Sequence, residues 1–201
     1  MWSLISNHSQ TTNNLLYIDD KVHQLDLTAA LAAVSDERRS YALRFRHEQG
    51  RRLCLAAFLL LQRALKEQYG IGKVPSFTYG ANGKPSLDGF PHIHFNLSHC
   101  REAVACIVDD EPVGVDIESI GRYSPSLLDY TMSLEEQQRI LQSPEPAAEF
   151  ITLWTMKESR LKLTGEGITR DLHSVLVDEH QYRFHTITRP DYIVTTCHHR
   201  H

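Results

Sequence analysis

Two acidic residues stand two positions apart near the middle of the chain, in the segment Gly114-Val-Asp116-Ile-Glu118. Because alternate residues of a β-strand point to the same face, Asp116 and Glu118 would lie side by side, with their apolar neighbours on the opposite face. Two adjacent carboxylates repel each other unless a cation lies between them. Oxygen-only ligands suit Mg²⁺, which takes one or two carboxylates together with water and substrate phosphates. The alternative interpretation is an exposed acidic strand face.

A second charged pair, Glu158 and Lys162, has the i, i+4 spacing that places both side chains on one helical stripe. As an isolated surface pair it would contribute only about 0.2–0.5 kcal/mol, and that is the simpler interpretation. The aromatic and apolar neighbours Phe150, Trp154 and Leu161 instead indicate a helix that packs against another element. The charged stripe is therefore expected to border a cleft.

A third cluster could bind an anion. Asn82-Gly83 is a strong turn signal, which would place Lys84 on a loop with its ammonium free to meet a phosphate. Ser98 and His99 come at the end of a predicted strand, where side-chain and backbone donors can converge on an anion. Taken separately, these residues also fit a plain hairpin turn and a strand-end histidine.

The periodicity of the chain predicts the elements that carry these residues. Ser35 fits a helix N-cap because two acidic residues follow it in the first turn. Helical spacing continues through residues 51–69, with a break at Gly50, and Gly70 supplies the stop.

Strand signals dominate the next part of the chain, residues 74–118. Residues 92–97 alternate between apolar and polar side chains. Residues 103–108 and 113–117 flank the turn-like quartet 109–112, and together they predict a hairpin. One or two earlier strands are predicted from the alternating apolar residues at Leu4, Leu15 to Ile18 and Val22.

A second helical region and a second set of strands complete the chain. Ser133 and Glu136 have the spacing of a capping box, and residues 147–163 predict a longer helix that Gly165 ends. The tail, residues 175–196, alternates again and predicts two or three strands.

This order of elements indicates an α+β fold built from two similar halves. The halves, about residues 1–108 and 112–196, meet near residues 109–112 and form a single unit over residues 1–201. We expect a ligand site at the junction of two such halves.

Composition excludes several classes of protein. The chain has 201 residues, 41% of them hydrophobic, and a formal net charge of -4, which argues against a nucleic-acid binder. The longest apolar stretch, residues 53–61, is too short to span a bilayer, and residues 1–8 show no secretory signal. The four cysteines are scattered, which fits free thiols in a reducing compartment. We therefore expect a cytoplasmic protein with no nucleic-acid or membrane partner.

Together the three clusters resemble the Sfp-type 4'-phosphopantetheinyl transferases of the holo-acyl-carrier-protein synthase superfamily. The family pattern is a Gly-Lys-Pro turn, then Asn-x-Ser-His, then Gly-Val/Ile-Asp-x-Glu, then Trp-x-x-Lys-Glu-x-x-x-Lys-x-x-Gly. The same motifs, in the same order, are Gly83-Lys84-Pro85, Asn96-Leu97-Ser98-His99, Gly114-Val115-Asp116-Ile117-Glu118 and Trp154 to Gly165. The resemblance covers about residues 35–170, and its last motif is the most specific.

The resemblance implies a 4'-phosphopantetheinyl transferase fold, with two pseudo-twofold-related α/β halves in one chain and the active site between them. Because one chain supplies both halves, we expect a monomer. In the family, the residues that correspond to Asp116, Glu118 and Glu158 hold Mg²⁺, which also binds the pyrophosphate of coenzyme A.

The resemblance also implies contacts with coenzyme A. Residues corresponding to Lys84, Ser98 and His99 contact the nucleotide end, including its 3'-phosphate, and Lys162 reaches the pyrophosphate. An arginine of the first helix usually meets the 3'-phosphate as well. Here Arg51 and Arg52 are both candidates for this contact.

The implied reaction transfers the 4'-phosphopantetheine group of coenzyme A to a serine of an apo acyl or peptidyl carrier protein and releases 3',5'-ADP. Glu158 is expected to contact the metal and to accept the serine proton, directly or through a water. Lys162 is expected to stabilise the charge on the leaving phosphate. Fatty-acid, polyketide and nonribosomal-peptide carriers all remain open as substrates.

Three other functions fit the sequence less well. Another Mg²⁺-dependent phosphotransferase would share the carboxylates, but the chain has no GxxxxGK[ST] loop. The run Cys197-His-His-Arg-His201 could suggest zinc, but it lacks paired spacing and fits a frayed terminus better. A non-catalytic carrier-protein binder would be expected to have lost Lys162 or a metal carboxylate, and none is missing.

Overall fold

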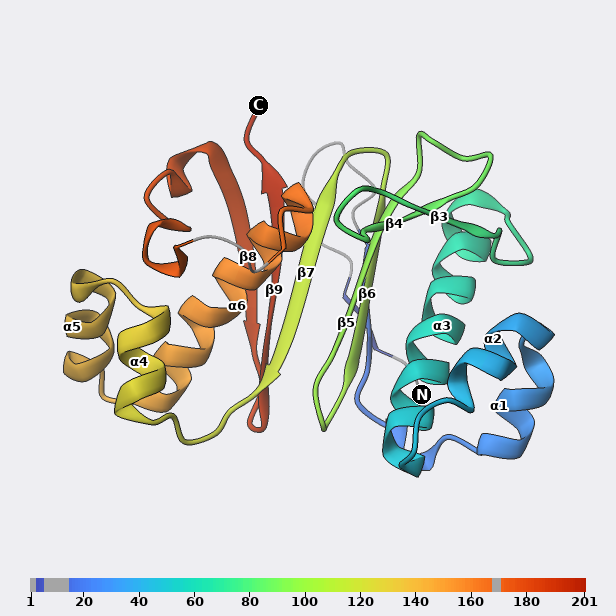
Figure 1. Cartoon of the computed structure of the whole chain (residues 1–201), viewed down its shortest axis with the longest axis horizontal. Coiled ribbons are helices and arrows are strands. Elements are labelled where there is room, and N and C mark those ends of the chain that lie inside the picture. Colours follow the sequence, from blue (N-terminus) through green and yellow to red (C-terminus); the bar gives the residue numbers. More distant parts are fainter. Residues whose placement is uncertain (1–2, 6–14, 168–170) are drawn as a thin grey trace.

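A computed structural model of the chain describes residues 3–5, 15–167 and 171–201. Helices and antiparallel strands are both abundant, which confirms the predicted α+β class. Figure 1 shows the strands in the middle of the molecule, with the long helix α3 (Glu48–Tyr69) on one side and the long helix α6 (Pro146–Thr164) on the other. Each long helix covers its own sheet.

The first sheet has the strand order β1-β2-β6-β5 and carries α3. The apolar stripe of α3, which includes Leu53, Leu60 and Ala64, is buried against this sheet as the helical spacing predicted. Both N-terminal strands are present, whereas Val22 begins a short 3-10 helix. The strands of this sheet are β1 (Ser3–Ile5), β2 (Leu15–Asp19), β5 (His94–His99) and β6 (Val104–Asp109).

The second sheet has the strand order β7-β9-β8 and carries α6. The tail forms two strands, in agreement with the sequence, and the second of them continues to His199. The Cys197–His199 segment is therefore paired sheet, so the expectation of a frayed terminus was wrong. The strands are β7 (Val113–Ser119), β8 (Tyr182–Thr188) and β9 (Tyr192–His199).

The predicted hairpin between β6 and β7 is not formed. β6 pairs with β2 and β5, β7 pairs with β9, and the described ladders include none between β6 and β7. Instead, the free edge of β7 receives side chains of β5: the amide of Val115 donates to Asn96 Oδ1 (3.0 Å) and that of Ile117 donates to Ser98 Oγ (3.4 Å). Polar side chains thus join the two sheets where a backbone ladder was expected.

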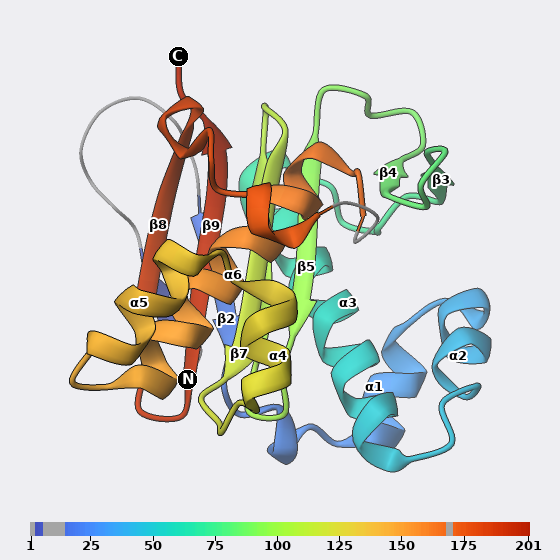
Figure 2. The same cartoon turned by 60° about the vertical axis from the view of Figure 1, so that its left-hand side comes forward.

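The helices of the first half begin and end largely as predicted. Ser35 caps α2, and Gly70 ends α3 in the left-handed conformation with φ 69°. The break, however, precedes Gly50, which lies inside α3. Glycine suits this position because a Cβ there would lie 3.0 Å from Cδ1 of the Phe45 ring. The shorter elements, visible beside α3 in Figure 2, are α1 (Leu27–Ala33), α2 (Asp36–Ala42), β3 (Phe77–Tyr79) and β4 (Pro85–Leu87).

The second half has its own cap signals. Ser133 and Glu136 form the predicted capping box, and Gly165 ends α6 in the left-handed conformation. Two shorter helices, α4 (Pro125–Thr131) and α5 (Leu134–Gln142), pack near the outer side of α6 (Figure 2). No helix in the described ranges is long and apolar enough to cross a membrane. Most of residues 1–8, where no secretory signal was expected, lies outside the described part of the chain.

Helix α6 lies very close to β7 at Gly114. A Cβ atom on Gly114 would lie 1.9 Å from the carbonyl oxygen of Ser159 and 2.7 Å from the amide nitrogen of Leu163. Because both contacts are backbone atoms, no side-chain rotation can relieve them. Glycine at position 114 therefore allows the charged stripe of α6 to lie directly over the carboxylates of β7.

We expect Gly114→Ala to displace α6 and to lower the free energy of unfolding by about 1–3 kcal/mol, the usual cost of overpacking. Chemical denaturation measures this loss. Gly121→Ala is the matched control, since a Cβ there meets nothing within 4 Å and should change stability by less than about 0.5 kcal/mol. Equal stability of the two variants would show that the close approach at Gly114 does not constrain the helix.

Candidate active site

Strand β7 presents Asp116 and Glu118 on one face, as its alternation predicted, while Val115 and Ile117 lie in the apolar core. Asp116 is only 2% exposed. The interpretation as an exposed acidic strand face is therefore wrong. Asp116 is a buried carboxylate at the junction of the two sheets.

Asp116 belongs to a hydrogen-bonded network of three polar side chains. Its Oδ1 accepts a hydrogen bond from Ser98 Oγ (2.9 Å) and lies 2.6 Å from Lys162 Nζ, which also donates to Ser98 Oγ (2.8 Å). The network joins β5, β7 and α6, three elements far apart in the sequence. Lys162 thus pairs with Asp116, so the interpretation of Glu158 and Lys162 as a surface ion pair was wrong.

The contact of Asn96 with β7 was not predicted from the sequence. Asn96 is 9% exposed, and its side-chain oxygen accepts the amide of Val115 on the free edge of β7. With Ser98, it fixes the register between β5 and β7, and therefore the place of Asp116. The Asn-x-Ser-His motif contains both residues, but it does not reveal which strand they bind.

Glu158 and Glu118 complete an acidic cluster. Burial raises the pKa of Glu158, and the neighbouring Asp116 carboxylate raises it further. Burial, followed by the charges of Asp116 and Glu158, raises the pKa of Glu118 to about 7, although Lys162 and the Trp154 indole oppose the shift. Among the residues described, Asp116 Oδ2 and Glu158 Oε1 are buried without a hydrogen-bond partner. The cluster thus holds more negative charge than its protein neighbours neutralise.

The raised pKa of Glu118 predicts a pH-dependent stability. The pKa of the Glu118 carboxyl is about 7 in the folded protein, against its ordinary value of 4.5, which applies to the unfolded chain. Between these values the unfolded chain binds fewer protons, so the Glu118 contribution to the free energy of unfolding falls as pH rises. A glutamine at position 118 does not titrate, so Glu118→Gln removes this fall in the free energy of unfolding. Its stability relative to the unmodified protein should therefore be higher at pH 8 than at pH 5.

Urea unfolding of chelator-treated protein at the two pH values measures this difference. Glu179→Gln, at an exposed position, serves as the control and should show no comparable change. A Glu118→Gln stability difference that is the same at both pH values would contradict the raised pKa.

The two predicted phosphate contacts beside the network differ in their surroundings. Burial lowers the pKa of His99, and the nearby Lys162 ammonium lowers it further, so its imidazole is held in the neutral form. Lys84 follows the predicted Asn82-Gly83 turn, but its ammonium is not free: it donates to the carbonyl of Leu163 (2.7 Å). The expectation of a free Lys84 ammonium was therefore wrong.

A pocket of about 210 Å³ lies between the β3–β4 turn and the C-terminal half of α6. Glu158, Lys162, Lys84 and Asn96 line it, together with Gly165. Residues of both halves thus meet at one cavity. A ligand site at the junction of the halves stays a prediction.

A larger pocket of about 570 Å³ adjoins the first and shares Pro85 and Leu97 with it. Arg38 and Arg44 line this pocket, and the Arg38 guanidinium lies 4.3 Å from the centre of the Phe58 ring. These two arginines were not predicted as site residues, because they precede Arg51 and Arg52, the arginines that were expected to contact the phosphate.

Arg51 and Arg52, the two candidates from the sequence, are absent from the lining of both pockets. Arg51 Nε donates to the carbonyl of Phe45 (2.9 Å). Arg52 pairs with Glu48 (2.6 Å) and donates to the carbonyl of Leu25. Their contact with a phosphate stays a prediction.

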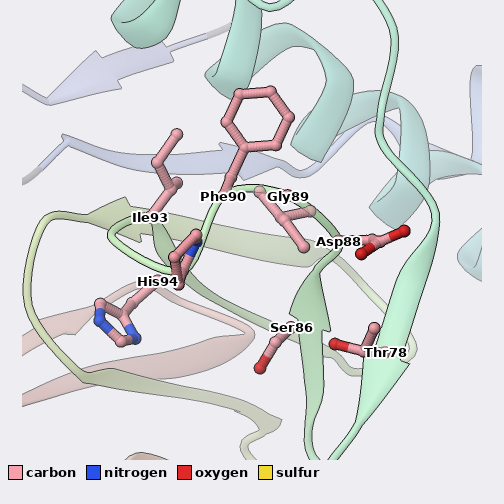
Figure 3. A pocket seen from close by; sticks show the side chains of 9 residues that line it. Thr78, Ser86, Asp88, Gly89, Phe90, Ile93 and His94 are labelled. Carbon is pink, nitrogen blue, oxygen red and sulfur yellow. The ribbon is translucent and has the colours of Figure 1, made fainter.

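A third pocket, of about 390 Å³, lies on the other face of the β3–β4 hairpin (Figure 3). The side chains of Thr78, Ser86 and His94 line it, and Phe90 and Ile93, above them in this view, line it as well. None of the residues that the sequence assigned to the site lines this pocket. It is therefore separate from the acidic cluster.

The donor set of the acidic cluster suits a hard cation. Asp116, Glu118 and Glu158 offer carboxylate oxygens only, and two of these oxygens lack a partner among the described residues. The side chains are not already arranged as a complete metal site: in the described ranges, no group of three or more His, Cys, Asp or Glu is placed to hold a metal ion. Lys162 stands instead against Asp116. By the chemistry of their oxygen atoms, the residues present fit Mg²⁺.

The sequence is similar to those of known proteins. A family model described as the 4'-phosphopantetheinyl transferase superfamily matches residues 112–200. 4'-Phosphopantetheinyl transferase psf-1 of Bacillus pumilus is 37% identical over 160 residues, which cover 78% of this chain and 69% of that protein. The chain belongs to the 4'-phosphopantetheinyl transferase superfamily.

Two further phosphopantetheinyl transferases support this membership over similar lengths. Sfp of Bacillus subtilis is 31% identical over 179 residues, covering 88% of this chain and 80% of that protein. HetI of a Nostoc species is 31% identical over 176 residues, covering 78% of this chain and 74% of that protein. The resemblance to phosphopantetheinyl transferases in the sequence motifs is thus confirmed.

Proposed function

We propose that the protein transfers the 4'-phosphopantetheine group of coenzyme A to a serine of an apo acyl or peptidyl carrier protein and releases 3',5'-ADP. The observation that carries the proposal is the cluster of Asp116 and Glu118 on β7 with Glu158 and Lys162 on α6. Glu158 and Lys162 also line the pocket bordered by the Lys84 turn. A carboxylate cluster with an adjacent ammonium suits a reaction at a pyrophosphate.

Mg²⁺ is the proposed cofactor, held by Asp116, Glu118 and Glu158. The raised pKa values of Glu118 and Glu158 and the unpartnered oxygens of Asp116 and Glu158 support this assignment, because an added cation would relieve the repulsion among the three carboxylates. When bound, Mg²⁺ would neutralise charge on the pyrophosphate of coenzyme A.

The side chains of the protein supply the remaining chemistry. The serine oxygen of the carrier protein bonds to the β-phosphorus of coenzyme A, and the bond from that phosphorus to the oxygen of the leaving 3',5'-ADP breaks. Glu158 accepts the serine proton, directly or through a water, and its raised pKa favours that role. The Lys162 ammonium, already held by Ser98 and Asp116, stabilises negative charge on the leaving phosphate.

The nucleotide end of coenzyme A is assigned to the larger neighbouring pocket. Arg38 and Arg44 offer cations there, and Phe77 and Tyr79 offer aromatic surfaces for a base. Before Arg51 or Arg52 could contact a phosphate there, its present hydrogen bonds would have to break. Lys84 lines the smaller pocket, and Ser98 and His99 lie beside Lys162, which also lines it. These three residues are proposed to contact the phosphates.

The proposed partners are coenzyme A and an apo carrier protein. The site draws on both sheets of one chain, which supports activity as a monomer of two halves, about residues 1–108 and 112–196. The four cysteines, all in the described ranges, are buried and unpaired, which supports the proposal of a cytoplasmic protein.

The decisive experiment mixes the protein with several apo carrier proteins, coenzyme A and Mg²⁺, and measures intact masses. We expect one carrier to gain the mass of one phosphopantetheine group. Replacing its acceptor serine by alanine, or adding a chelator, should abolish the gain. No mass gain on apo carriers of all three pathway types would reject the proposed transfer.

A further inference from the structure

The C-terminal end of α6 is bound by side chains from the first half of the molecule. Lys84 Nζ donates to the carbonyl of Leu163 (2.7 Å), and Asn82 Nδ2 donates to the carbonyl of Gly165 (2.9 Å). The last carbonyls of a helix have no partner within the helix, so their partners must come from elsewhere. Here they come from the β3–β4 turn, about 80 residues away in the sequence: the two bonds span 79 and 83 residues.

Charge and packing both favour this contact. The C-terminal end of a helix carries a partial negative charge, which an ammonium such as that of Lys84 stabilises. Burial lowers the pKa of Lys84 and so opposes the charged form that this contact favours. The side chain also packs on Gly165: a Cβ there would lie 3.2 Å from Lys84 Cδ.

The same helix end carries the proposed chemistry. Glu158 and Lys162 lie within the last two turns of α6, and they line one pocket together with Asn82 and Lys84. Any fraying or tilt at Leu163 would therefore move Lys162 relative to Asp116, with which it makes a 2.6 Å ion pair.

We infer that Asn82 and Lys84 form a C-cap for α6 across the two halves, and that through this cap they position Lys162 and Glu158. Both are thus positioning residues for the reaction. The consequence for catalysis rests on the proposed function, whereas the cap itself does not.

This role is compatible with a phosphate contact by Lys84, because an ammonium has three donors and Leu163 uses one of them. The two roles nevertheless predict different results. A pure phosphate ligand would change the affinity for coenzyme A and leave the ligand-free protein as it was. A cap changes the ligand-free protein as well.

Hydrogen exchange of the full chain without coenzyme A tests the cap. Asn82→Ser keeps a residue suited to turns but removes the reach to Gly165, and Lys84→Met keeps the apolar stem but removes the ammonium. Each variant should speed exchange in the last turn of α6 by about two- to tenfold, the range for one lost hydrogen bond. Lys73→Met, which removes a charge from an exposed loop, is the control and should leave this exchange unchanged.

Steady-state kinetics with coenzyme A and an apo carrier protein test the positioning role. Asn82→Ser should lower kcat by about two- to tenfold with little change in KM for coenzyme A, and Lys84→Arg should restore the exchange protection that Lys84→Met loses. Unchanged exchange in both Asn82→Ser and Lys84→Met would overturn the cap. Faster exchange with unchanged kcat would overturn the positioning role. If no carrier is modified at all, the proposed function fails while the exchange data still decide the cap.

Discussion

Replacing Glu158 by glutamine should slow phosphopantetheine transfer by at least roughly 10²–10⁴-fold, the contribution of a positioned general base. Glu158 is 8% exposed, its Oε1 has no hydrogen-bond partner among the described residues, and burial raises its pKa. Glutamine keeps the shape and one oxygen but loses the negative charge and nearly all basicity. The proton acceptor and a proposed metal ligand would therefore be lost together.

Turnover at saturating coenzyme A and thermal unfolding should both be measured for this variant. A folded Glu158→Gln protein with normal turnover would remove Glu158 from the active site. Glu135→Gln is the control, because Glu135 is an exposed glutamate in the first turn of α5 and should not affect transfer.

The second large effect is expected at Asp116. Asp116→Asn removes the charge that holds Lys162 and takes one carboxylate from the proposed Mg²⁺ ligands. Because both charge-stabilising groups are affected, transfer should fall by at least about 10²-fold. The Mg²⁺ concentration needed for half-maximal activity should rise as well. Asparagine keeps the size of the side chain and an oxygen that can accept the Ser98 hydroxyl.

A Mg²⁺ titration distinguishes this role from a purely structural ion pair. A structural pair predicts lower stability with an unchanged Mg²⁺ requirement, and that outcome would exclude Asp116 as a ligand. Glu67→Gln is the control, since it breaks the 2.7 Å pair with Arg63 on α3, outside the site. This surface substitution should cost less than about 1 kcal/mol and leave transfer unchanged.

Local signals in the sequence determined much of the fold and the identity of the site residues. The N-cap at Ser35, the capping box at Ser133 and the helix ends at Gly70 and Gly165 all have the predicted geometry. Strand alternation placed Asp116 and Glu118 on one face. These features depend on residues within a few positions of one another, so the sequence alone contains the information.

Only the tertiary structure decided which distant groups meet. β7 pairs with β9 and receives Asn96 and Ser98 from β5, so the hairpin expected from adjacent strands was wrong. In the same way, Lys84 binds the end of α6, and Arg38 and Arg44 line the pocket that Arg51 and Arg52 do not. Many different groups could form hydrogen bonds with a free strand edge or an ion pair with a charged side chain. The local sequence does not indicate which of these groups is the partner. Burial of the whole chain selects the partner, because only the folded core determines which polar groups lose water and must pair.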